Sequence, residues 1–160
     1  MARSVGDQVP STTVTLATAE GPKPVQSEEL FAGKKVLLFA VPGAFTPLCS
    51  GQHLPGYIAK ADSIAAKGVD EILCLSVNDA FVMDAWGKAL DATGKVGMVA
   101  DGNANFTKAM GLELDATPMQ MGVRSQRYAM LVEDGVIKDL QVEEGRSFEV
   151  SSADHMLERI

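Results

Sequence analysis

Residues 35–50 read KVLLFAVPGAFTPLCS and combine the signals of a strand, a loop and a helix start. Residues 35–41 form an almost continuous apolar run, which is typical of a strand covered on both faces of its sheet. A Pro-Gly pair ends that run. Thr46 is a favoured N-cap residue, and Pro47 is favoured at the first helical position. We therefore expect a buried strand that leads through a short loop into a helix, with Cys49 in its first turn.

The rest of the chain alternates between strand and helix patterns. Strands are expected near residues 14–17, 71–77 and 97–101, helices near 27–33, 54–67, 80–90 and 103–110, a β-hairpin at 127–143, and a final helix opening at 151. This order predicts an α/β fold with a central mixed sheet flanked by helices on both faces. We expect one domain over residues 1–160, with an N-terminal extension and a C-terminal hairpin plus helix.

Two proline-containing stretches are expected to interrupt these elements. Residues 21–24 read GPKP and should break the first strand. Pro55 falls inside the helix that follows Cys49 and should kink or interrupt it, because proline removes a helical hydrogen bond.

Composition excludes several classes of protein. The chain has 160 residues, of which 46% are hydrophobic and 22% charged, with a net charge of −7. This acidic balance, without clustered Lys and Arg, argues against a nucleic-acid partner. The longest apolar runs are strand-sized, so no membrane-spanning segment is expected. Two cysteines do not make a disulfide framework, which favours a reducing compartment and a chemically active thiol.

Cys49 is the main candidate for chemistry. In the first helical turn, free backbone N–H groups and the positive end of the helix dipole favour a thiolate, which is the nucleophilic form of cysteine. The small side chains of residues 42–44 allow a small substrate to approach the backbone closely. An inert buried cysteine is the alternative interpretation.

Other polar residues support weaker hypotheses. His53 lies four residues after Cys49, but neighbouring positions on a helix do not converge on a substrate as a hydrolytic Cys–His pair must. His155 and the other candidate ligands show no zinc-binding spacing, so no metal is expected. Arg124 and Arg127 flank a strand start and could neutralise a thiolate or lie on the surface. Cys74 is expected to be either a small buried side chain or a second, resolving thiol.

At the level of motifs, VPGAFTPLCS (residues 41–50) closely resembles the active-site segment of peroxiredoxins, the thiol peroxidases. It is most similar to the subfamily of plant type II peroxiredoxins and the fifth mammalian peroxiredoxin, in which PGAFTPxCS is followed by HLPG, here residues 53–56. The resemblance continues through CLSVNDAFV (74–82), GVRSQRYAMLVEDGVIK (122–138) and SSAD (151–154). It implies a thioredoxin-like fold and reduction of hydrogen peroxide and alkyl hydroperoxides without a metal or organic cofactor.

The resemblance also implies roles for individual residues. Cys49 matches the peroxidatic cysteine, Thr46 the hydroxyl that binds the thiolate and the peroxide, and Pro42 the proline that shields the pocket. Arg127 matches the active-site arginine. Three further residues are expected to contact the substrate, with Arg124 ranked below Arg127 as the arginine of the site: Gly43, Leu48 and Arg124.

Two routes are possible for the second half of the reaction, in which the oxidised Cys49 is reduced again. Cys74 matches the cysteine taken as the resolving residue in plant members. The C-terminal stretch that carries the resolving cysteine of animal members corresponds to SFEVSS (147–152), which has no cysteine. Cys74 or an outside thiol must therefore resolve the oxidised form.

Partners and compartment follow from the same resemblance. Glutaredoxin, glutathione and thioredoxin are the expected reductants, and a homodimer is expected. The protein is expected in the cytoplasm, or in a plastid or mitochondrion if a transit peptide has been removed. Two rivals are a thiol–disulfide oxidoreductase, which the absence of a Cys-x-x-Cys motif disfavours, and a redox-sensing or chaperone-like binding protein on the same fold.

Overall fold

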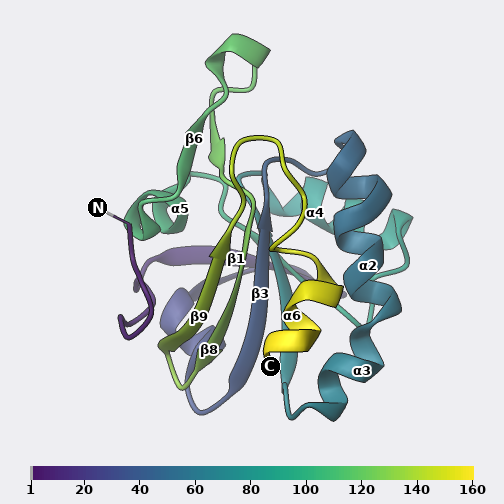
Figure 1. Cartoon of the computed structure of the whole chain (residues 1–160). Helices are drawn as coiled ribbons and strands as arrows, with labels where there is room; N and C mark the ends of the chain where they lie inside the picture. Colours follow the sequence, from purple (N-terminus) through teal and green to yellow (C-terminus); the bar gives the residue numbers. More distant parts are fainter. Residues whose placement is uncertain (1) are drawn as a thin grey trace.

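The computed structural model describes residues 2–160 and is built on a seven-stranded sheet (Figure 1). The strands follow the order β2-β1-β5-β4-β3-β8-β9. Their bounds are β1 Thr13–Thr18, β2 Gly21–Gln26, β3 Lys35–Val41, β4 Glu71–Ser76, β5 Gly97–Ala100, β8 Tyr128–Glu133 and β9 Val136–Val142. Strand β4 runs parallel to β3 and β5, and the other neighbours are antiparallel. The predicted mixed sheet is therefore confirmed.

Helices cover both faces of this sheet, as expected. Their bounds are α1 Ser27–Phe31, α2 Leu54–Ala59, α3 Ala61–Ala66, α4 Ala80–Ala89, α5 Asn105–Met110 and α6 Ala153–Arg159. Side chains alternate along a strand, so Leu37 and Phe39 of β3 pack with α2, α3, α4 and α6, whereas Val36 and Leu38 pack with α1 and α5. None of the helices in residues 2–160 is long and apolar enough to cross a lipid bilayer.

The first strand shows that the expected break at GPKP is wrong. Residues 21–24 open β2, which pairs antiparallel with β1 along its whole length. Strand β2 is the edge of the sheet and has one neighbour. Proline is tolerated at an edge because its missing N–H faces solvent instead of a partner strand.

Two hairpins precede α6 in the C-terminal part of the chain. The predicted turn between β8 and β9 is confirmed, with Asp134 and Gly135 both at positive φ, 46° and 80°. This is the backbone of a tight hairpin turn that matches the twist of its strands. A second small sheet, β6 Glu113–Asp115 and β7 Val123–Ser125, forms an arm that projects from the top of the molecule (Figure 1). The 3₁₀-helix Thr117–Met119 lies at the tip of this arm.

Candidate active site

The segment after β3 folds as a loop and a helix start. The chain is helical from Pro47 onward, and the backbone N–H of Ser50 donates to the carbonyl oxygen of Thr46 at 2.9 Å. This bond confirms the predicted start of the helix at Thr46 and Pro47. The Thr46 hydroxyl donates to the carbonyl oxygen of Gly43 at 2.7 Å and so stabilises the loop between β3 and this helix.

A wide helical turn follows and contains Cys49. Residues Cys49–His53 form a π-helix, in which the N–H of Leu54 bonds to the carbonyl of Cys49, five residues earlier. Pro55 stands directly after this turn and cannot donate to residue 51. The predicted interruption at Pro55 is therefore confirmed and takes the form of a widened turn. Such single π-turns occur often at functional sites.

Arg127 links the two buried side chains of this turn. Its Nη2 donates to the Cys49 sulfur at 3.0 Å, and its Nη1 lies 2.7 Å from Nδ1 of His53. Cys49 and His53 are fully buried, and Arg127 is 8% exposed. A hydrogen bond from a charged donor, shielded from water, is stronger than the same contact would be at the surface.

The hydrogen bonds of His53 define which ring nitrogen carries its proton. A guanidinium can only donate, so Nδ1 of His53 accepts from Arg127. Nε2 then carries the hydrogen and donates to the carbonyl oxygen of Ser151 at 3.0 Å. Burial, followed by the charge of Arg127, lowers the pKa of His53 to about 3, although the bond to Ser151 opposes this shift. His53 is therefore neutral near pH 7 and does not repel Arg127.

A cavity of about 720 Å³ opens beside this cluster. Pro42, Thr46, Leu48 and Arg127 line it, together with apolar residues from the projecting arm and the loop before β7: Leu114, Ala116, Met119 and Met121. The structure thus brings four of the predicted site residues to one cavity. Glu143 and Arg146 line it as well, so the cavity combines a few charged groups with mostly apolar walls.

Arg124 and Gly43 lie close to the site but have other contacts. Arg124 donates from Nε to Met121 O at 2.9 Å and from Nη1 to Val77 O at 3.1 Å. Among residues 2–160, it is not one of those that line the cavity. A Cβ added to Gly43 would lie 3.1 Å from the Thr46 side chain and 3.3 Å from Met121, so glycine keeps this loop close to its neighbours. The geometry supports ranking Arg127 above Arg124.

Cys74 has a different environment in the middle of β4. It pairs in register with Phe39 of β3 and Met98 of β5, and its side chain is fully buried. Burial raises the pKa of the Cys74 thiol well above its usual range, and a negative charge on Cys49 raises it further, while Arg127 acts in the opposite direction. Both cysteines are free thiols in this structure.

The contacts of Arg127 extend to residues that sequence reasoning does not place in the site. The sequence suggests His53 as part of a hydrolytic pair and within the HLPG motif, but it assigns no role in the site to Tyr57, Glu143 or Ser151. Tyr57 donates to the same Ser151 carbonyl that His53 binds, at 2.7 Å. Residues 2–160 hold no group of three or more His, Cys, Asp or Glu side chains arranged to bind a metal ion.

Comparison with known proteins places this geometry in a family. Residues 4–157 match the family model described as Redoxin. The chain is 51% identical to Peroxiredoxin-2E, chloroplastic, of Arabidopsis thaliana, covering 98% of this chain and 69% of that protein. It is 49% identical to Peroxiredoxin-2B of the same plant, covering 98% of both.

Among solved structures, the chain is similar to the crystal structure of reduced Prx3 in complex with H2O2 from Vibrio vulnificus. The two sequences are 54% identical, the match covers 98% of both chains, and the structures superpose with a TM-score of 0.94. This chain belongs to the peroxiredoxin family. The resemblance of its motifs to that family and the predicted thioredoxin-like fold are confirmed. Peroxiredoxins are thiol peroxidases, so the predicted enzyme class, an oxidoreductase that reduces peroxide with a cysteine thiol, is confirmed as well.

Proposed function

We propose that Cys49 is the peroxidatic cysteine of this peroxiredoxin. Its thiolate attacks the terminal oxygen of a hydroperoxide, an S–O bond forms, and the O–O bond breaks. The sulfur is oxidised to a sulfenic acid, while the peroxide is reduced to water or an alcohol after a proton reaches the leaving oxygen. The observation that carries this proposal is the 3.0 Å hydrogen bond from Arg127 to the Cys49 sulfur.

Arg127, Thr46 and Pro42 complete the proposed reaction centre. Negative charge moves from sulfur to the leaving oxygen as the O–O bond breaks, and a fixed guanidinium stabilises that charge without reorganising. The Thr46 hydroxyl, which donates to Gly43 in the resting site, would turn toward the peroxide or sulfur when substrate binds. Pro42 lines the same cavity and restricts access of water to the thiolate.

The cavity supports hydrogen peroxide and alkyl hydroperoxides as substrates. Leu48, Leu114, Met119 and Met121 provide apolar surface beside Arg127. An alkyl group can occupy that surface while the peroxide oxygens lie toward the charged base, as in other pockets with apolar walls and a few polar groups. The Vibrio protein forms a crystalline complex with H2O2 in its reduced state, which supports the smaller substrate here.

The sulfenic acid is then reduced by Cys74 or by an outside thiol. Cys74 matches the resolving cysteine of plant members, which supports an internal disulfide. Its burial in a central strand means that this disulfide requires local unfolding. Glutathione, glutaredoxin or thioredoxin would complete the cycle by thiol–disulfide exchange.

Assembly and compartment belong to the same proposal. A homodimer is expected from the family resemblance, and light scattering tests it directly. The Arabidopsis relative at 51% identity is described as chloroplastic, which supports a plastid over the cytoplasm or a mitochondrion for this chain. We further propose that residues 1–160 act as one domain, because both core clusters share the same sheet.

Turnover distinguishes this function from a redox sensor or holdase. Reduced protein is supplied with a large excess of hydrogen peroxide and, in separate assays, with glutathione plus glutaredoxin or with thioredoxin plus its reductase. A peroxidase consumes many equivalents of peroxide per chain with at least one of these systems. Consumption of a single equivalent with every reductant would instead support the sensor.

A further inference from the structure

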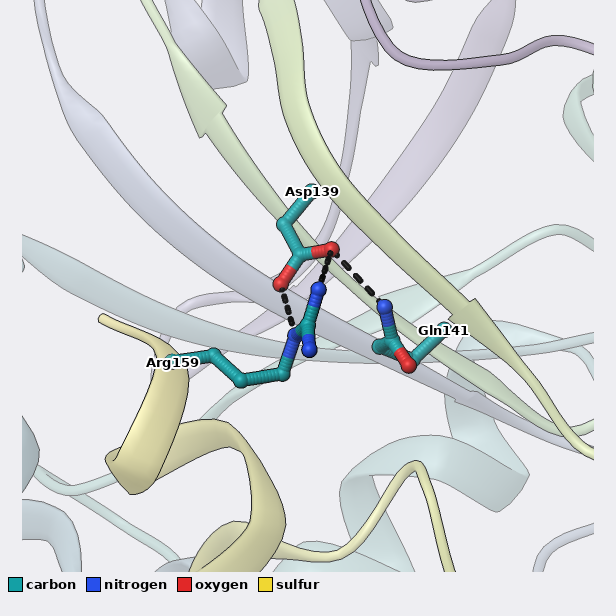
Figure 2. A network of polar contacts seen from close by, with 3 residues as sticks. All are labelled: Asp139, Gln141 and Arg159. Carbon is teal, nitrogen blue, oxygen red and sulfur yellow. Dashed lines mark hydrogen bonds and ion pairs between the residues drawn. The ribbon is translucent and has the colours of Figure 1, made fainter.

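The C-terminal segment is fastened to β9 at two acidic residues that share one face of the sheet. Asp139, Gln141 and Glu143 alternate along the strand and its continuation, so their side chains point the same way. Figure 2 shows the first attachment: Asp139 binds Arg159 of α6 at 2.6 and 3.1 Å and accepts from Gln141 at 2.9 Å. Glu143 makes the second attachment, beside the active site.

Glu143 stands next to Arg127 in the sheet but does not pair with its charge. The backbone N–H of Glu143 donates to the carbonyl of Arg127 at 2.9 Å. The two residues therefore lie side by side, Arg127 just before β8 and Glu143 just after β9. The side chain of Glu143 forms no ion pair in residues 2–160. The charge of Arg127 therefore stays available to Cys49.

The carboxylate of Glu143 is used to hold a turn. It accepts from the N–H of Glu149 at 2.9 and 3.0 Å, from the N–H of Ser151 at 2.8 Å and from the Ser151 hydroxyl at 2.6 Å. The residue is 6% exposed. Burial raises the pKa of Glu143, but the bonds from Ser151, Glu149 and Val150 outweigh it and hold that pKa below its usual range. The anchor is thus a buried, charged and fully bonded carboxylate.

The turn that Glu143 holds presents the Ser151 carbonyl to the active site. That oxygen accepts from Nε2 of His53 and from the Tyr57 hydroxyl. An acceptor at Nε2 stabilises the tautomer in which Nδ1 of His53 has a free lone pair for Arg127, just as outer partners fix the histidine ligands of metals. A chain of hydrogen bonds therefore runs from Glu143 through Ser151, His53 and Arg127 to Cys49.

We propose that Glu143 is a positioning residue of the peroxidase site, which acts through Ser151 and His53 on the aim of Arg127 at the Cys49 sulfur. The proposal rests on the proposed roles of Cys49 and Arg127. It assigns to the loop 143–151 a function in the first chemical step, beyond covering the core. It also explains why this carboxylate is buried beside an arginine without forming an ion pair with it.

The test compares Glu143→Gln with Asp139→Asn. Both variants remove a carboxylate that anchors the C-terminal segment to β9, but Asp139 binds Arg159 and has no path to His53. The rate of Cys49 oxidation by hydrogen peroxide is measured by quench-flow mass spectrometry, and the thiolate absorbance near 240 nm is followed against pH. Glu143→Gln is expected to slow the oxidation of Cys49 about tenfold and to shift the thiolate titration. Asp139→Asn should change the oxidation rate by less than about twofold and leave the titration as in the wild type.

A double-mutant cycle shows whether the effect passes through His53. In a His53→Gln background, adding Glu143→Gln should slow oxidation less than about twofold, because the link is already broken. An equal loss in both backgrounds would overturn the proposal. If Glu143→Gln does not fold, Ser151→Ala removes one bond to the carboxylate and should slow oxidation in the same direction; an unchanged rate and titration there would overturn it too.

Arg127→Lys separates this proposal from the proposed function. If Arg127→Lys slows oxidation and folded Glu143→Gln does not, Glu143 has no positioning role while the role of Arg127 stands. If Arg127→Lys reacts as fast as the wild type, the role of Arg127 itself is wrong, and the proposal for Glu143 is wrong with it.

Discussion

The two cysteines are equally buried, yet the structure gives them opposite chemical surroundings. Cys49 lies in a π-turn, accepts a hydrogen bond from Arg127 and is next to a cavity. Cys74 lies in the middle of β4, where burial raises the pKa of its thiol. Burial therefore does not distinguish the two thiols. We propose that a positioned cation and a neighbouring cavity make Cys49 the reactive thiol.

Exchange of each cysteine for serine should give the largest contrast. Cys49→Ser should reduce peroxide turnover to background, because a serine hydroxyl is a weak nucleophile without a general base. Cys74→Ser should leave the rate of the first oxidation within about twofold of the wild type, since Arg127 binds the sulfur of Cys49 and not that of Cys74. Stopped-flow assays with hydrogen peroxide measure both. Loss of the first oxidation in a folded Cys74→Ser protein would remove the distinction between the two thiols.

The two arginines sharpen the account of Cys49. Arg127→Lys should lower the rate of Cys49 oxidation by about 10²-fold, comparable to the loss of one oxyanion donor, because lysine cannot reach sulfur and His53 with one planar group. Arg124→Lys should lower the rate of Cys49 oxidation less than about tenfold, because Arg124 donates to the carbonyl oxygens of Met121 and Val77 and not to the Cys49 sulfur. The same oxidation assay applies. A larger loss at Arg124 would reverse their ranking.

Stability should respond to the cysteines in the reverse order of activity. Cys74→Ser places a hydroxyl in a buried apolar strand and should lower the free energy of unfolding by about 1–3 kcal/mol. Cys49→Ser should cost less, because Arg127 offers its hydroxyl a hydrogen bond. Urea unfolding under reducing conditions compares the two variants. Equal losses of unfolding free energy would mean that the hydrogen bond from Arg127 does not stabilise a serine hydroxyl at position 49.

His53 connects the active site to acid stability. Its pKa is about 3 in the folded protein against an ordinary value of 6.5. Between these pH values the unfolded chain binds a proton that the folded chain does not, so the free energy of unfolding falls as the pH is lowered from 6.5. His53→Gln should reduce that slope by up to about 1.4 kcal/mol per pH unit. Urea unfolding at several pH values measures it; identical slopes would show that His53 titrates normally.

Much of the fold could be predicted because local patterns determine it. The apolar run of β3, the Asp134–Gly135 turn and the helix start at Thr46 each follow from neighbouring residues. Strand β2 could not be predicted in this way because the tolerance of proline there depends on its edge position, which is a tertiary fact.

The active site, like the fold, contains residues that the sequence predicts and others that it does not. Cys49, Thr46, Pro42 and Arg127 come from motifs that can be read along the chain. The structure brings Thr46, Pro42 and Arg127 to one cavity and joins Cys49 to Arg127 by a hydrogen bond. The link from Glu143 through Ser151 to His53 joins residues that are up to 98 positions apart. No spacing in the sequence indicates it. The sequence suggests His53 only as a base, because its contact with Arg127 depends on packing between a helix and a strand.

Locating the first oxygen tests the central claim most directly. Reduced wild type and Cys49→Ser are each treated with one equivalent of hydrogen peroxide, quenched within seconds, and analysed by intact mass and peptide mapping. We predict one added oxygen on Cys49, or the loss of two hydrogens in a Cys49–Cys74 disulfide, and no change in Cys49→Ser. Oxygen on Cys74 first, or equally fast oxidation of Cys49→Ser, would contradict the account.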